Sequence, residues 1–148
     1  MPSLRKTFAT NLKKFRELRG LSQEGAAESA GGDRTSISRI ERTAPNLSLA
    51  RVVMIAQALD VSAARMLMEG AAGRGKDPAP KFKDVGKVGE AVRACRMKGN
   101  LSQRELGDLA GLDRNHISRV ETKANNLALD TLEKIVAALG VPIDQLMP

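Results

Sequence analysis

Two stretches of ten residues carry the side chains of this chain that are best suited to recognising another molecule. Residues 33–42 recur as residues 113–122, at a spacing of 80 residues. A guanidinium group can donate two hydrogen bonds to O6 and N7 of guanine, and an asparagine amide can pair with adenine. The side chains in question are Arg34, Thr35, Ser38 and Arg39 in the first copy, and Arg114, Asn115, Ser118 and Arg119 in the second.

The apolar residues of the two stretches predict the elements that position these side chains. Ile37 and Ile40 are three apart, as are Ile117 and Val120, so each pair lies on one face of a helix with the polar residues opposite. Such a helix fits the major groove of DNA. An ordinary surface helix explains either copy alone equally well, and the surroundings of the two copies favour recognition.

Those surroundings are themselves repeated. Residues 21–68 aligned with residues 101–148 without a gap are identical at 19 of 48 positions, which indicates a duplicated unit. Residues 70–83 are rich in glycine, alanine and proline and predict a flexible linker. We therefore expect a first domain over 1–69, the linker over 70–83 and a second domain over 84–148.

Caps and apolar spacing predict five helices in each domain and no strand, an all-α fold. In the first domain we expect helices near 4–19, 23–29 and 62–68, and between the last two a third helix capped by Asp33 and a fourth capped by Ser48 that includes Leu49 to Leu59. Ser22 is the expected N-cap of the second helix. In the second domain, Ser102 and Asp113 are the expected N-caps, Gly111 and Gly140 the expected helix ends, and Pro142 begins the last helix.

Composition argues against several other classes of protein. The net charge of +7 fits a polyanionic partner. The single cysteine, Cys95, cannot form an intramolecular disulfide and is expected to be a small core residue. His116 is the single histidine and supplies neither a metal site nor a catalytic triad. We therefore expect no bound metal, no cofactor and no enzymatic activity. The absence of a membrane-length apolar run and of a signal peptide predicts a cytoplasmic, nucleoid-associated protein with no membrane partner.

A set of residues around both stretches follows one pattern: Leu21-Ser22-Gln23-Glu24, Ala27, Ala30-Gly31, Thr35, Ile37-Ser38 and Ile40-Glu41-Arg42, and in the second copy Leu101-Ser102-Gln103, Leu106, Ala110-Gly111, Ile117-Ser118 and Val120-Glu121. This pattern resembles the helix-turn-helix of the Cro and phage-repressor (XRE-like) family. Asp33-Arg34-Thr35 with Ile37-Ser38, Ile40-Glu41-Arg42 and Asn46-Leu47 further resembles controller proteins of restriction-modification systems.

The resemblance implies two tandem repressor-like domains and a role for each matching polar residue. Gln23 and Gln103 would bind a phosphate at the start of the second helix, and Asn46 and Asn126 would contact the DNA backbone. The residues expected to contact bases or phosphates on the recognition helices are Arg34, Thr35, Ser38, Arg39, Arg114, Asn115, His116, Ser118 and Arg119.

The first unit departs from the family pattern in its core. Gly25 lies inside a helix, where glycine costs about 0.5–1 kcal/mol relative to alanine. Ala26 and Gly32 stand where apolar residues are usual, whereas the second unit has Leu106 and Leu112, with Leu109 in place of Ser29. We expect these leucines to be buried and the second unit to be the more stable.

The function implied is a sequence-specific double-stranded DNA-binding transcriptional regulator, a repressor or controller, with two recognition helices in the major groove. The alternative is an antitoxin that also regulates its own operon. The sequence does not decide whether a toxin or a polymerase is a protein partner. The apolar last helices, near 62–68 and 142–147, suggest a homodimer, although the two units could also pair within one chain on an imperfect palindrome.

Overall fold

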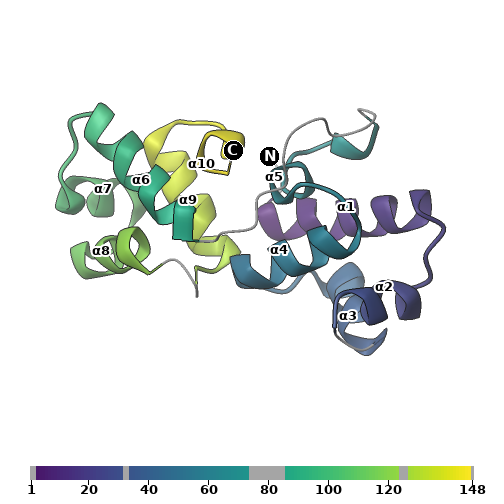
Figure 1. Ribbon diagram of the computed structural model, residues 1–148. Coiled ribbons are helices and arrows are strands. Elements are labelled where there is room, and N and C mark those ends of the chain that lie inside the picture. The colour runs from purple at the N-terminus through teal and green to yellow at the C-terminus, as the bar shows by residue number, and fades with distance from the viewer. Residues whose placement is uncertain (1–2, 32–33, 74–85, 124–126, 148) are drawn as a thin grey trace.

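The computed structural model describes residues 3–31, 34–73, 86–123 and 127–147, and within these ranges it contains helices and no strand. Two similar helical units lie side by side (Figure 1). The predicted all-α fold is confirmed. The expected N-cap Asp33 and the expected contact residue Asn126 lie outside the described residues.

The first unit contains five α-helices and a short 3-10 turn. Ser22, Ser48 and Ser62 accept a hydrogen bond from the backbone N–H three residues ahead, so the side chains predicted to begin two of these helices do so. The elements are α1 (Leu4–Leu18), α2 (Gln23–Ser29), α3 (Arg34–Thr43), α4 (Leu49–Ala58), α5 (Ala63–Met66) and η1 (Ala71–Gly73).

The second unit repeats this order. Ser102 and Glu105 form a reciprocal capping box, Asp113 caps the next helix, and Gly111 and Gly140 end helices with a positive φ, as predicted. Pro142 stands just before the last helix rather than in it. The elements are α6 (Gly86–Lys98), α7 (Gln103–Ala110), α8 (Arg114–Thr122), α9 (Leu129–Leu139) and α10 (Ile143–Leu146).

In unit one α3 packs on α1 and α2, and in unit two α8 packs on α6 and α7. In unit one, Phe8, Leu12 and Phe15 form the buried stripe of α1, and Ile37 and Ile40 face it from α3. In unit two, α6 approaches α8 so closely that a Cβ on Gly89 would lie 2.5 Å from the carbonyl oxygen of Val120. That glycine therefore sets the distance between the two helices.

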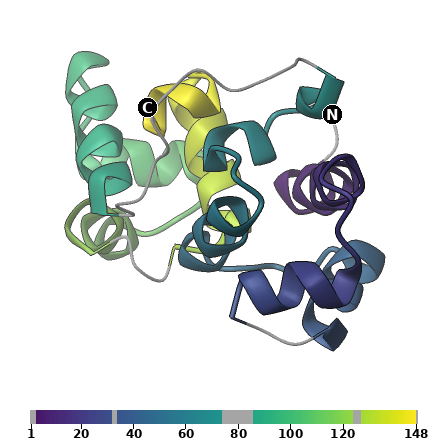
Figure 2. The ribbon, with the colours of Figure 1, turned by 45° about the vertical axis from the view of Figure 1, so that its right-hand side comes forward.

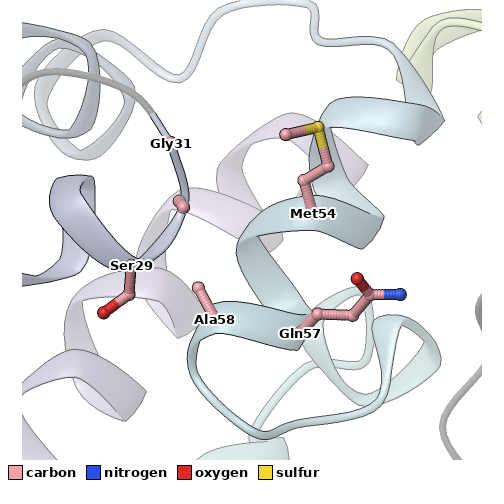
Figure 3. Close-up of a pocket in the computed structure, with 6 residues that line it drawn as sticks. Ser29, Gly31, Met54, Gln57 and Ala58 are labelled. Carbon is pink, nitrogen blue, oxygen red and sulfur yellow. The ribbon is translucent and has the colours of Figure 1, made fainter.

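The packing around the two helix-turn-helix motifs differs partly as expected. Unit one has a hollow of about 370 Å³ where α2 ends beside α4, and Figure 3 shows Ser29 and Gly31 on one side of it and Met54, Gln57 and Ala58 of α4 on the other. In unit two, Leu106 is fully buried and Leu112 packs partly buried on the core. The expectation for Leu109 was wrong, because it lies near the C-terminal end of α7 with 63% of its surface exposed.

The two units meet along a reciprocal contact. The N–H of Leu49 donates to the carbonyl of Leu127 (2.7 Å), and the N–H of Leu129 donates to the carbonyl of Leu47 (2.9 Å). These bonds make an isolated antiparallel bridge between Ser48 and Ala128, which are 80 residues apart and therefore equivalent in the repeat. Because each position contacts the counterpart of its partner, an approximate two-fold axis passes through the bridge.

The last helices complete this junction. α5 packs against α10, and the two helices lie side by side in both views (Figures 1 and 2). Apolar residues of this region are almost fully buried within the chain, so the surface that suggested a homodimer is already covered by the chain itself. They are Met66, Leu67, Leu146 and Met147.

Candidate nucleic-acid interface

The two predicted recognition helices are α3 and α8, which contain residues 34–42 and 114–122 of the equivalent decapeptides. On α8 the side chains of Arg114, Asn115 and Arg119 are exposed, whereas His116 and Ser118 are half-buried. The apolar side of α8, with Ile117 and Val120, is buried. The polar residues therefore occupy the free side of the helix, as the sequence predicts.

The structure describes fewer side chains on α3 than on α8. Arg39 is exposed and Ser38 is half-buried, so both occupy positions like those of Arg119 and Ser118. Arg34 and Thr35 form the first turn of the helix, but their side chains lie outside the described part of the structure. Their proposed contacts with bases remain predictions.

An arginine of the first helix of each unit pairs with a glutamate on α3 or α8. Arg16 Nε and Nη2 donate to the two carboxylate oxygens of Glu41 at 3.0 and 2.9 Å, and Nη1 donates to the carbonyl of Leu21 at 2.9 Å. One guanidinium group thus joins α1, the turn before α2, and α3. Bidentate pairs of this kind fix orientation as well as contributing energy.

Unit two repeats this clamp 80 residues later. Arg96 Nε and Nη2 donate to Glu121 at 2.7 and 3.0 Å, and Nη1 donates to the carbonyl of Leu101 at 2.8 Å. The Glu121 side chain is only 3% exposed. The hydrogen bond from each arginine to its glutamate raises the pKa of Arg16 and Arg96, against the opposing effect of burial. Both guanidinium groups therefore stay charged and keep their ion pairs with α3 and α8.

The two predicted phosphate-binding glutamines begin α2 and α7 and are half-buried. Gln103 Nε2 also donates to Glu121 Oε1 at 3.3 Å, which ties this side chain to the clamp of unit two. Gln103 is therefore oriented by the same carboxylate that holds α8. The sequence pattern predicted where Gln103 lies but not this contact.

Asn46, which the resemblance predicts to contact the DNA backbone, has a hydrogen-bond partner in the other unit. Its Oδ1 accepts a hydrogen bond from the N–H of Asp130 at 3.0 Å, so Asn46 caps α9. The N-cap residue of α9 is Ala128, which has no side chain able to do this, whereas the equivalent Ser48 caps α4. The exposed side chain of Asn46 still has its amide NH₂ group to offer to a phosphate.

Sequence reasoning missed Arg51. Its Nη2 donates to Ser36 Oγ on the recognition helix at 2.9 Å, which brings a further guanidinium group to α3. The repeat places Thr131 and His116 at these positions in unit two, so this pair belongs to unit one alone. The available signal was that Arg51 is the single charged residue in the otherwise uncharged sequence of α4.

Within the described residues, no group of three or more His, Cys, Asp and Glu side chains is placed to hold a metal ion. Cys95 is a free thiol, partly buried against the core. No helix in the described ranges combines the length and apolar character needed to cross a membrane.

Comparison with known proteins identifies the family. A family model described as helix-turn-helix matches residues 12–65 and again residues 92–146. The chain belongs to the helix-turn-helix family. This is a family of DNA-binding transcription regulators, of the Cro and phage-repressor type predicted above, and it is not an enzyme family.

Individual relatives each match a segment the size of about one unit of this helix-turn-helix protein. Control protein C.SmaI of Serratia marcescens is 37% identical over 67 residues, covering 45% of this chain and 80% of the relative. A hypothetical transcription factor of Neisseria meningitidis is 46% identical over 56 residues, covering 38% of this chain and 53% of that protein. The immunity repressor of Bacillus phage phi105 is 32% identical over 60 residues, covering 40% of this chain and 42% of the repressor.

A solved structure gives a similar result. The crystal structure of the hypothetical transcription factor from Neisseria is 38% identical in sequence and covers 46% of this chain and 78% of that one, with a TM-score of 0.44. The matched segment of this chain spans about half the length of the curated Neisseria sequence.

Proposed function

We propose that this chain is a sequence-specific transcriptional regulator in which one polypeptide presents two recognition helices to double-stranded DNA. A dimeric repressor places two identical helices in successive major grooves through a two-fold axis. The reciprocal bridge between Ser48 and Ala128 supports the proposal, because it relates α3 and α8 by such an axis inside one chain.

The two half-sites of the operator should differ. Unit one offers Arg34, Thr35 and Ser36 in the first turn of its recognition helix, with Arg51 beside it, whereas unit two offers Arg114, Asn115 and His116. Asparagine can pair with adenine, a contact that threonine cannot reproduce with the same two hydrogen bonds. The operator is therefore expected to be an imperfect palindrome.

Selection of bound fragments from genomic DNA, followed by footprinting, tests the proposal. The expected footprint covers two unlike half-sites separated by about one turn of the duplex, 34–36 Å between centres. Exchanging the two half-sites in place should leave affinity unchanged, since the complex can turn round, whereas replacing one half-site with a copy of the other should reduce it. A single protected half-site would overturn the proposal of two recognition helices.

Homodimerisation, which the apolar end helices suggested from sequence, would need a different surface or an exchange of units between chains, because α5 and α10 pack together within the chain. Sedimentation at micromolar concentration distinguishes these states. A mass of 15.9 kDa supports the single-chain pair, and twice that mass supports the homodimer.

The alternative function is that of an antitoxin which also regulates its operon. Copurification of the full chain with the product of a neighbouring gene, and suppression of that product's toxicity, would favour this alternative over a regulator that acts alone.

A further inference from the structure

An open cavity of about 660 Å³ lies on the junction between the two units. One wall comes from the first turns of α1 and from the segment after α5, both in unit one. The other comes from α9 and the turn into α10, in unit two. Because both units contribute, the shape of the cavity depends on how the units are oriented.

The lining has an uneven chemistry. Most of its surface is apolar and includes Leu4, Met68, Val136 and Pro142, and its charged groups are the carboxylates of Glu69 and Glu133. None of the described residues that line it is basic, although the chain carries a net charge of +7. The volume lies within the range of about 300–1,000 Å³ that small organic ligands occupy.

Glu133 is held in place at the edge of this cavity. Its Oε1 accepts the N–H of Leu4 at 2.6 Å, which orients the carboxylate from α9 towards the N-terminal end of α1. The repeat has Val53 at the equivalent position of α4, and Val53 is 4% exposed. The carboxylate is therefore a property of this side of the junction and not of both copies of the repeat.

We propose that this cavity binds a small organic cation, with an apolar body against the α9 wall and an ammonium group beside Glu133 and Glu69. Apolar walls with one sign of charge select a ligand that carries both an apolar surface and the opposite charge. A bound cation bridges the two units and favours the orientation of α3 and α8 in which the cavity is closed around it. That effect on DNA rests on the function proposed above.

Binding is tested on the free full-length protein by isothermal titration calorimetry with three molecules of similar size. These are 4-phenylbutylamine, 4-phenylbutanol and 4-phenylbutyrate, which are cationic, neutral and anionic at pH 7. The amine is expected to bind with one site per chain, at least tenfold more tightly than the carboxylate. Equal binding of amine and carboxylate, or no binding of the amine at millimolar concentration, would overturn the proposal.

Glu133→Gln is the decisive variant, because the amide oxygen can still accept the N–H of Leu4. It should weaken the amine at least tenfold and change the alcohol less than twofold. Glu90→Gln, at an exposed glutamate of α6 away from the cavity, makes the same change in net charge and should leave the amine unaffected. If both variants weakened amine binding equally, net charge alone would explain the effect, and the proposed site at Glu133 would be contradicted.

A second variant tests the position of the apolar body. Ala137→Phe adds bulk to an exposed residue of α9 that lines the cavity, and it should weaken the amine and the alcohol together. Unchanged affinity for both molecules would place their binding elsewhere and overturn the proposal.

Coupling to DNA is measured separately. The amine should change operator affinity at least threefold, and by linkage the operator should change affinity for the amine by the same factor. If the amine binds but operator affinity does not change, the proposed coupling to DNA is contradicted, whereas the proposed binding site still stands. A chain that binds the amine and no DNA contradicts the proposed function instead.

Discussion

Ser48 and Ala128 face each other across an antiparallel bridge, although they occupy the same position in two copies of one repeat. Ser48 caps α4 with its own hydroxyl, but Ala128 has none, and α9 is capped by Asn46 from the other unit. The second unit lacks a cap hydroxyl at this position, and a residue of the first unit supplies the missing hydrogen bond across the junction.

Asn46→Ala should therefore destabilise the second unit rather than the first. Loss of an N-cap typically costs about 1 kcal/mol, so the free energy of unfolding should fall by about that amount. Hydrogen exchange should report the loss in the first turn of α9. Ala128→Ser restores a local cap, and in its presence Asn46→Ala should cost clearly less; additive costs would mean that Asn46 does not act through α9.

Glu121→Ala should be one of the more damaging single substitutions outside the apolar core. It leaves Arg96 without its bidentate partner in a place where both side chains are mostly buried, at 12% and 3% exposed. Removing one partner of such a pair costs about 3 kcal/mol or more. Urea unfolding measures this, with Asp130→Ala as control, because the Arg5–Asp130 pair is well exposed and should cost below about 1 kcal/mol.

Leu106 and Leu109 should respond very differently to truncation. Leu106→Ala removes a side chain with 0% exposure and should cost about 2–5 kcal/mol. Leu109→Ala removes one that is 63% exposed and should change stability by no more than about 0.5 kcal/mol. Thermal or urea unfolding of the full chain measures the loss of stability in each variant. Comparable losses in the two variants would contradict the described orientation of α7.

Arg114→Ala and Arg34→Ala should each weaken the operator complex by about 1–3 kcal/mol and relax base preference in one half-site only. Arg93→Ala serves as control, since Arg93 is an exposed arginine on α6 rather than on a recognition helix. Fluorescence anisotropy with operators mutated in one half-site measures both effects. An unchanged affinity and footprint for either variant would remove that unit from base recognition.

Glu105 should make a pH-dependent contribution to stability. Hydrogen bonds from the backbone and then the side chain of Ser102 lower its pKa below the ordinary value of 4.5. A group with a lowered folded-state pKa stabilises above its unfolded pKa and loses that stabilisation as the pH falls through its folded pKa. The difference in melting temperature between the parent and Glu105→Gln should therefore be constant above pH 6 and shrink below about 4.5.

Local signals in the sequence were sufficient for most of the fold. Ser22, Ser102 and Asp113 begin helices, and Gly111 and Gly140 end them, because caps act on the backbone within three or four residues. Leu109 was misjudged because its spacing from Leu106 suits an apolar face, while only the packing of α7 decides how far that face extends over the core.

The junction was beyond local signals for a different reason. A repeat specifies that two surfaces are alike, but pairing within one chain and pairing between two chains use the same residues. Asn46 illustrates this, since its amide suits a phosphate as well as the N-terminus of α9. Arg51 was overlooked because its helix is otherwise uncharged and mostly apolar, so the spacing drew attention to its core side.

The reciprocal bridge changes how occupancy would respond to expression level. Two separate subunits must first meet, so the amount of a dimer rises with the square of a low subunit concentration and the regulated gene switches over a narrow range. Units tied on one polypeptide are already at high effective concentration. For the single-chain regulator proposed above, occupancy is therefore expected to follow the first power of protein concentration and to give a graded response that begins with the earliest molecules made.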